Sequence, residues 1–477
     1  MDKLDKLNYI NGEWVGKDEQ KFEIINPANG EVIGTMPEGT EDDVNKAIDA
    51  AHKALPAWRD LTAEERAGYL ETVYDLMMEN EDELATIMTL ENGKPMKESR
   101  AEVHYAASFF KWFAGEARRI YGKTIPGKAK NHRIQVVHQP VGVVAAITPW
   151  NFPAAMITRK MGPALAAGCT FLVKPPKETP LTSIKLIEYC EQAGIPKGVV
   201  NHIVSPDEVF SNTIKDSTKV RKLTFTGSTE VGTLLMKQSA EHIKNVSFEL
   251  GGQAPLIVMD DADLEKAVQG AMDSKFRNAG QTCIASNRYY VQSGIHDQFV
   301  DRITDEVKKL KVGNGLEEGI DIGPLINKEG YEKVEKHVDD AVDKGAKVVV
   351  GGKGGERDGG YYYEPTILTD VTDDMICMNQ ETFGPLIPIR KIESDEEGVR
   401  LANDTRYGLA GYFFTESVTR GTKIYEAMDY GIIGWNHGAP SAAQAPFGGM
   451  KESGIGREGG HEGIEEYLET KYISLGL

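Results

Sequence analysis

Cysteine is scarce in this 477-residue sequence, and its four copies stand far apart. No two of them form a Cys-x-x-Cys pair, so the sequence carries neither a disulfide framework nor a thiolate zinc site. The ten histidines are equally scattered, with no spacing typical of metal ligands. We therefore expect no metal centre, and we expect a reducing compartment, the cytoplasm. The four cysteines are Cys169, Cys190, Cys283 and Cys377.

Long apolar runs are also missing. The most apolar window, residues 141–157, is interrupted by Thr148, Pro149, Asn151 and Pro153, which are unsuited to a membrane span. The N-terminus carries charged residues where an export signal needs an apolar segment. The sequence therefore predicts neither a membrane span nor an export signal.

Positive charge is in deficit, because 54 Lys and Arg residues face 73 Asp and Glu residues and leave a net charge of −19. Such a balance disfavours binding to nucleic acids or to anionic membranes. An anionic ligand therefore needs lysines or arginines placed locally, against the overall field. The hydrophobic content of 40% is ordinary for a soluble globular protein, and the length predicts two or three domains.

Predicted strands and helices alternate along most of the chain, which indicates parallel, doubly wound α/β sheets. The first series has a boundary near residues 251–252, after which the alternation restarts as a second α/β domain. The glycine-rich tract 351–360 is predicted to be an exposed turn. Strands are expected at 170–174, 199–204, 222–226, 246–249, 254–259, 347–350, 366–369 and 388–392, and helices at 154–167, 182–193, 230–241, 262–276, 297–310 and 328–344.

Cys283 ends the polar stretch 276–283, which contains a glycine. We expect this loop to run into the start of a helix, where unpaired backbone N–H groups favour a reactive thiolate. The alternative is that Cys283 is a small buried apolar residue, as most free cysteines are.

Other polar residues stand where predicted strands end. Asn151 lies between two prolines, and its amide could stabilise an oxyanion or only a turn. Glu249 precedes two glycines and is either a general base or a solvated carboxylate. Lys174 and Lys177 end a strand at the edge where such sheets bind ligands, although both could be surface lysines. The loop 226–232 could place backbone N–H groups on a pyrophosphate, but it lacks the G-x-G-x-x-G spacing and could be an ordinary turn.

Together these features resemble the aldehyde dehydrogenase superfamily over nearly the whole chain. Six blocks carry the resemblance, in one order: PWNFP (149–153), FTGSTEVG (225–232), ELGG (249–252), GQTC (280–283), ETFGP (381–385) and PFGG (446–449). The resemblance implies a Rossmann-type NAD(P)-binding domain, an α/β catalytic domain and a small β-segment for oligomerisation into a homodimer or homotetramer. The implied NAD(P)-binding domain covers 1–120 and 140–250, and the implied catalytic domain covers 251–440. The implied oligomerisation segments are 121–139 and 460–477.

The resemblance also implies roles for the residues above. Cys283 would attack an aldehyde, Asn151 and the Cys283 backbone N–H would hold the oxyanion, and Glu249 would activate the water that hydrolyses the resulting thioester. Such covalent catalysis divides one difficult reaction into two easier ones, and the cofactor carries the hydride. The implied cofactor contacts are Trp150, Lys174, Lys177, Gly227, Ser228, Gly232, Glu381 and Phe383.

Lys177 departs from the pattern of NAD-preferring relatives, which carry a glutamate at this position to bind the ribose 2′-hydroxyl. An ammonium group attracts a 2′-phosphate that a carboxylate would repel, so we expect NADP to be used and favoured over NAD. Glu178 offers an alternative, because a shifted loop could let it take the ribose role. Some relatives also carry a second cysteine at the position of Ala285, so the redox disulfide of those relatives should be absent.

Within the superfamily, the sequence most resembles succinate-semialdehyde dehydrogenases. Arg159, Arg277 and Ser441 match the residues that hold the substrate carboxylate in that family, and arginine can bind a carboxylate with two hydrogen bonds. We therefore expect a small carboxylated aldehyde as substrate. Three alternatives stay open: glutarate or 2-oxoglutarate semialdehyde as substrate, a non-catalytic binding protein, and a structural pairing of Arg159 with a helix carboxylate.

Overall fold

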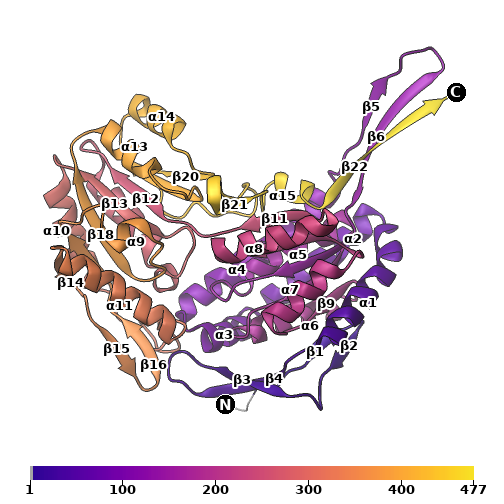
Figure 1. Cartoon of the computed structure of the whole chain (residues 1–477), viewed down its shortest axis with the longest axis horizontal. Helices are drawn as coiled ribbons and strands as arrows, with labels where there is room; N and C mark the ends of the chain where they lie inside the picture. Colours follow the sequence, from indigo (N-terminus) through magenta and orange to yellow (C-terminus); the bar gives the residue numbers. More distant parts are fainter. Residues whose placement is uncertain (1–3) are drawn as a thin grey trace.

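The larger of two main sheets has eight strands in the order β2-β1-β9-β8-β7-β10-β11-β21 (Figure 1). The computed structural model describes residues 4–477. Five central strands run parallel, and the outer strands at both edges are antiparallel. The strands are β1 (Asn8–Ile10), β2 (Glu13–Val15), β7 (Val143–Ile147), β8 (Thr170–Lys174), β9 (Val200–His202), β10 (Val220–Thr226), β11 (Asn245–Glu249) and β21 (Gly454–Ile455).

The register of this sheet brings the predicted site residues to one edge. Ile147 pairs with Lys174 and with Phe225, and Thr226 pairs with Glu249. Four strands therefore end in nearly the same row, and the loops that follow them emerge side by side. Ligands bind at this carboxyl edge in open parallel sheets.

The second sheet has seven strands in the order β14-β17-β18-β13-β12-β19-β20. All neighbours are parallel except β14 and β17, and the strands are β12 (Ala254–Val258), β13 (Ser286–Gln292), β14 (Lys347–Val350), β17 (Thr366–Thr369), β18 (Leu386–Ile392), β19 (Ala410–Phe414) and β20 (Ile432–Trp435). The alternation predicted from the sequence, with a second series of strands after residue 252, is confirmed.

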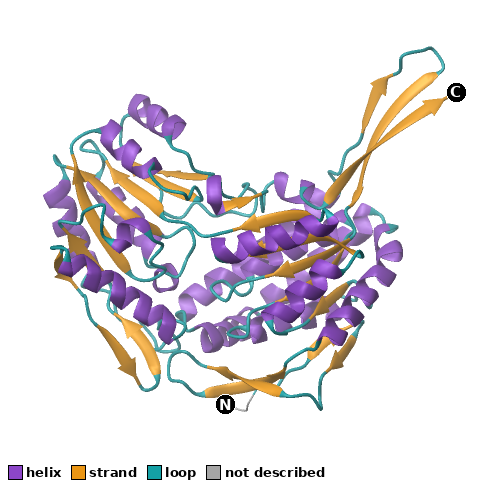
Figure 2. Cartoon of the chain, in the orientation of Figure 1, coloured by secondary structure: helices purple, strands orange, loops and turns teal. Residues whose placement is uncertain are grey.

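Helices cover both main sheets (Figure 2). The larger sheet is associated with α1 (Glu41–Arg59), α2 (Ala63–Glu79), α3 (Glu81–Asn92), α4 (Met96–Ala117), α5 (Ala155–Ala167), α6 (Pro180–Gln192), α7 (Asp207–Asp216) and α8 (Thr229–Ser239). The second is associated with α9 (Leu264–Lys275), α10 (His296–Val307), α11 (Lys328–Asp343), α12 (Ile376–Asn379), α13 (Asp395–Asn403) and α14 (Val418–Ala427), and α15 (Glu462–Glu465) precedes the last strand. No helix in the described range combines the length and apolar character needed to cross a membrane.

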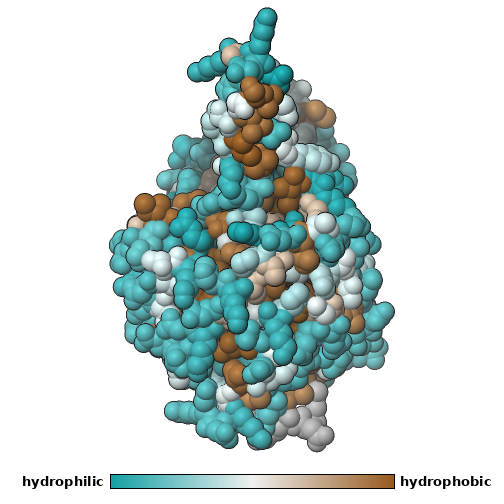
Figure 3. All heavy atoms as spheres, turned by 90° about the vertical axis from the view of Figure 1, so that its right-hand side faces the viewer, coloured by the Kyte–Doolittle hydropathy of each residue, from teal (hydrophilic) through white to brown (hydrophobic). Residues whose placement is uncertain are grey.

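A three-stranded sheet projects from the body of the molecule (Figure 1). It contains β5 (Lys123–Pro126), β6 (His132–Pro140) and β22 (Leu468–Gly476), and β22 pairs with β6. Its exposed apolar side chains include Ile125, Val137 and Tyr472, and Figure 3 shows apolar residues gathered along this projection. The use of these segments in oligomerisation stays a prediction.

The tract 351–360, predicted to be an exposed turn, contains strand residues at 354–357 and 360, and its exposed turn is confined to Asp358 and Gly359. β15 (Gly354–Arg357) pairs with β16 (Gly360–Tyr363) as a hairpin. Asp358 and Gly359 have φ angles of 52° and 89°, the left-handed pair that a tight two-residue hairpin turn requires. The Asp-Gly pair was the signal for this hairpin. A second hairpin, β3 (Lys21–Ile25) with β4 (Val32–Pro37), lies near the N-terminus.

Candidate active site

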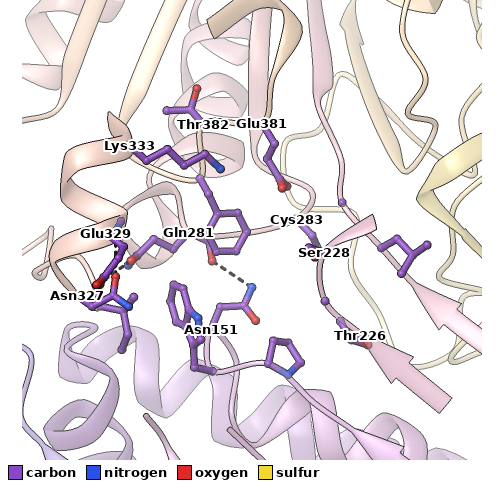
Figure 4. Close-up of a pocket in the computed structure, with 18 residues that line it drawn as sticks. Asn151, Thr226, Ser228, Gln281, Cys283, Asn327, Glu329, Lys333, Glu381 and Thr382 are labelled. Carbon is purple, nitrogen blue, oxygen red and sulfur yellow. Dashed lines mark hydrogen bonds between the residues drawn. The ribbon is translucent and has the colours of Figure 1, made fainter. Parts of the chain in front are cut away.

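A cavity of about 360 Å³ lies between the two α/β units. The first unit contributes the loops after β7, β10 and β11, and the second contributes segments that precede β13 and β18, together with the start of α11. Carboxyl ends of one sheet therefore face amino ends of the other. Figure 4 shows the cavity, and its lining includes Trp150, Asn151, Thr226, Gly227, Ser228, Gln281, Cys283, Lys333, Glu381 and Phe383.

Cys283 is partly exposed to this cavity, but no helix begins at it. A short 3-10 segment, Arg277–Gly280, precedes it, and β13 begins at Ser286. Asn278, Ala279 and Gly280 all have positive φ, at 52°, 54° and 76°. Left-handed residues in succession cannot continue a right-handed helix. The helix start predicted from the sequence is therefore wrong.

The thiol of Cys283 is protonated in the free protein. Burial raises its pKa to about 12, although the positive charges of Arg159 and Arg277 oppose that rise. This site therefore favours the thiol and not the resting thiolate that a helix start would favour. Attack on a carbonyl requires a proton acceptor at the time of reaction.

Asn151 is held in place from several sides. Its side-chain Nδ2 donates to the carbonyl of Gln281 at 3.1 Å (Figure 4), and its Oδ1 accepts from the Phe152 N–H at 3.1 Å. Its backbone carbonyl accepts from Lys94 Nζ at 2.7 Å and from Asn278 Nδ2 at 2.9 Å. The loop that carries the nucleophile is thereby tied to the loop that carries the amide.

Glu249 ends β11 and is only 2% exposed, so it is not a solvated surface carboxylate. Its Oε2 has no hydrogen-bond partner among residues 4–477. Burial, and then the negative charge of Glu458, raise its pKa well above the ordinary value, while Arg159 and Lys160 oppose the rise. Burial therefore favours the neutral acid form of Glu249. Its side chain is buried beside the cavity. The next two residues, Leu250 and Gly251, line the wall of that cavity.

The two predicted substrate arginines differ in their surroundings. Arg159 is 1% exposed, forms a salt bridge with Glu458 and stacks on Phe447 at 4.7 Å. The structural pairing that the sequence left open is therefore present, although Glu458 lies in a loop and not on a helix. Arg277 stacks on Phe152 at 4.9 Å and makes no salt bridge within the described part of the chain. Its Nε is buried and has no hydrogen-bond partner there.

Tyr105 joins these residues, and sequence reasoning missed it. Burial raises the pKa of its phenol, whereas the charges of Arg159 and Arg277 and a hydrogen bond with Ser441 lower it. Tyr105, Ser441 and the two arginines therefore form one polar cluster near Cys283. Tyr105 lies within α4, far from any motif, so no local signal marked it.

A second groove of about 620 Å³ continues from the cavity and shares Pro149, Thr226, Gly227 and Ser228 with it. Lys174 and Lys177 line its far end. The Ser228 side chain caps α8 by accepting from the Val231 N–H at 3.3 Å. The two hollows together form an elongated site that ends in positive side chains.

The groove fits a dinucleotide. The Thr226 Oγ1 is buried without a hydrogen-bond partner in the described structure, and it faces a helix N-terminus suited to phosphate. A side chain at Gly232 would meet the Leu250 Cδ2 at 2.3 Å, so glycine permits the close packing of α8, although Gly232 itself does not line the groove.

Glu381 and Phe383 lie at the Cys283 end of the site. Glu381 accepts from the Gly252 N–H at 3.2 Å, and burial raises its pKa to about 7. The rings of Phe383 and Trp150 meet edge to face at 5.6 Å. These residues place two aromatic rings and a buried carboxyl group at this end of the site. No group of three or more His, Cys, Asp or Glu side chains suited to a metal ion occurs in residues 4–477.

Comparison with known proteins gives matches over almost the full length. The sequence model described as the aldehyde dehydrogenase family matches residues 14–473. Succinate-semialdehyde dehydrogenase [NADP(+)] of Escherichia coli is 53% identical over 469 residues, covering 98% of this chain and 97% of the relative. Glutarate-semialdehyde dehydrogenase of Pseudomonas aeruginosa is also 53% identical, with the same coverage of 98% and 97%.

Solved structures give the same picture. An NADP-dependent enzyme of E. coli superposes with a TM-score of 0.98 at 52% identity, covering 99% of this chain and 98% of the other. Betaine aldehyde dehydrogenase of Staphylococcus aureus, in complex with NAD+, superposes with a TM-score of 0.95 at 39% identity, covering 99% and 95%.

Proposed function

This chain belongs to the aldehyde dehydrogenase family, and from that premise we propose that it oxidises succinate semialdehyde to succinate with NADP or NAD. The observation that carries the choice of substrate is Arg277, a cation without a salt bridge beside Cys283. Arg277 is half-buried and its buried Nε has no partner among residues 4–477, an arrangement that favours a ligand carrying negative charge. A carboxylated aldehyde supplies it.

We propose that Cys283 forms the covalent intermediate. Its Sγ adds to the aldehyde carbon to give a thiohemiacetal while the thiol proton passes to water, and the Asn151 Nδ2 and the Cys283 backbone N–H stabilise the oxygen that becomes negative. The Asn151 amide already lies at the cavity, held by hydrogen bonds. Donors fixed in advance stabilise developing charge without reorganisation. The thiohemiacetal is then oxidised to a thioester.

Glu249 is proposed as the base that activates water against the thioester. Because its pKa is raised, Glu249 resists ionisation in the resting protein. Once it has lost its proton, its carboxylate is a strong base.

The proposed cofactor contacts divide between the two ends of the elongated site. Trp150, Glu381 and Phe383 would hold the nicotinamide ribose near Cys283, and Gly227 and Ser228 would face the phosphates. A nicotinamide held there would supply the hydride acceptor that oxidation of the thiohemiacetal to the thioester requires. Gly232 would act indirectly, through the packing of α8.

Lys174 and Lys177 would hold the adenosine ribose, and Lys177 favours NADP because an ammonium group attracts the 2′-phosphate. The E. coli relative with NADP(+) in its name supports this proposal. Measurement of kcat/KM for both cofactors tests it: NADP should give the higher value, and a strong preference for NAD would contradict it.

Glutarate semialdehyde is a second candidate substrate, because a glutarate-semialdehyde dehydrogenase is as similar to this chain as the succinate-semialdehyde enzyme. The deciding experiment compares kcat/KM for succinate semialdehyde, 2-oxoglutarate semialdehyde, glutarate semialdehyde and butanal. We expect succinate semialdehyde to be first and butanal last. Equal values for butanal and the carboxylated aldehydes would refute the assignment of substrate class.

We propose that the three-stranded sheet of β5, β6 and β22 joins subunits into a homodimer or homotetramer, and that the enzyme works in the cytoplasm. The exposed apolar side chains of this projection support the oligomer. Sedimentation velocity of the purified protein tests the proposal, and a monomer at micromolar concentration would contradict it.

A further inference from the structure

Lys177 already has a counter-ion in the free protein. Its ammonium forms a salt bridge with Glu38 and lies 5.6 Å from the centre of the Phe22 ring. Both partners come from the N-terminal hairpin of β3 and β4 or from the residue that follows it, far from Lys177 in sequence (Figure 1). A group that binds Lys177 must therefore compete with a carboxylate.

The backbone at Glu38 is fixed on both sides. The Glu38 N–H donates to the Gln20 carbonyl at 3.1 Å, and the Gly39 N–H donates to the Val204 carbonyl at 2.7 Å. A side chain at Gly39 would meet the Ile203 Cγ2 at 2.7 Å, so the chain packs closely here. The Glu38 side chain is 30% exposed and held near Lys177.

The counter-ion of Lys174 is placed differently. Lys174 pairs with Asp207, whose side chain is 92% exposed and can turn away into solvent. Asp207 therefore offers an arriving phosphate little competition. Glu178, Asp207 and Glu208 line this end of the groove, whereas Glu38 reaches Lys177 from the segment after β4, where the backbone is held by the fold.

We infer that Glu38 determines cofactor selectivity, because it competes with the 2′-phosphate of NADP for Lys177. NAD carries an uncharged hydroxyl at the same position and has no need to displace Glu38. The carboxylate therefore weakens NADP binding and leaves NAD binding unaffected. As a result, the preference for NADP over NAD is smaller than Lys177 alone would give. This inference rests on the proposed use of NADP.

The test is isothermal titration calorimetry of NADP and of NAD into the full-length enzyme, without aldehyde, so that binding is measured apart from turnover. An exposed salt bridge is worth little, so Glu38→Gln should tighten NADP by roughly two- to fivefold. The Kd for NAD should stay the same. Glu41→Gln is the matched control, since it removes the same charge from an exposed side chain three residues along, and it should change neither Kd.

Lys177→Met separates the two levels of the proposal. It should weaken NADP binding, and in its background Glu38→Gln should have no further effect. If Lys177→Met leaves NADP binding unchanged, the proposed role of Lys177 in NADP use fails. Suppose instead that Lys177→Met weakens NADP binding as expected. The inference about Glu38 is then overturned, and the role of Lys177 is kept, if Glu38→Gln fails to tighten NADP binding or if it weakens NAD binding.

Discussion

Replacement of Arg277 by glutamine tests the substrate assignment most directly. Arg277 makes no salt bridge among residues 4–477, so its loss leaves no orphaned carboxylate in the protein. Glutamine keeps a polar side chain of moderate length over Phe152. The folded protein should therefore change little, with a loss of unfolding free energy below about 1 kcal/mol. Any large kinetic effect can then be assigned to the substrate.

The expected kinetic effect follows from the strength of a charge-assisted hydrogen bond. A hydrogen bond to a charged group contributes about 1.5–3 kcal/mol, which corresponds to a loss of roughly 10- to 150-fold in kcat/KM. The assay is initial-rate NADPH production with succinate semialdehyde and, as internal control, with butanal. Butanal lacks the carboxylate, so its kcat/KM should fall less than about twofold. Equal losses for both aldehydes would refute the role of Arg277 in binding the carboxylate.

Four further predictions concern the residues around Cys283. Glu249→Gln should keep a single rapid burst of NADPH but lower steady-state kcat by about 100-fold or more, because general-base help is worth roughly 10²–10⁴. In the parent enzyme, thioester hydrolysis should rise with pH through the raised pKa of Glu249, since only the ionised form is a base, and a rate independent of pH would contradict this. Arg159→Ala should lower the free energy of unfolding in urea by about 3 kcal/mol, since it leaves Glu458 buried with Lys160 alone; a loss below that of Arg277→Gln would contradict the pairing. With Ala285 beside it, Cys283 should react with peroxide to give sulfenic and then sulfinic acid, and a disulfide of Cys283 found by mass spectrometry would contradict this.

The sequence predicts those parts of the site that lie in contiguous blocks. Asn151, Glu249 and Cys283 stand in short motifs next to buried strands, and the parallel register brings two of these strand ends to one edge. Local pattern failed where backbone conformation decided the outcome. The positive φ angles at Asn278 and Ala279 exclude a helix, although both residue types occur in helices.

Partners far apart in sequence were beyond the reach of local patterns. The salt bridges of Arg159 with Glu458 and of Lys177 with Glu38 both join residues more than a hundred positions apart in the chain. Tyr105 looks like any residue of an amphipathic helix until the fold sets it beside Arg277. Such contacts arise from tertiary packing, which neither periodicity nor motif spacing encodes.

Burial around Cys283 also explains how a protein of net charge −19 can receive an anionic aldehyde. Arg159, Lys160 and Arg277 carry three positive charges against the single negative charge of Glu458, and burial favours the protonated forms of Cys283 and Glu249. The site is therefore cationic while it waits for substrate.

If Cys283 and Glu249 were both ionised at rest, those six groups would carry no net charge and would lose their attraction for the carboxylate. Two unit charges 4 Å apart interact by about 4 kcal/mol at an effective dielectric constant of 20, enough to decide whether an anion enters. The raised pKa of the thiol, which looks unfavourable for a nucleophile, thus serves substrate binding. Deprotonation is deferred to the step that needs it.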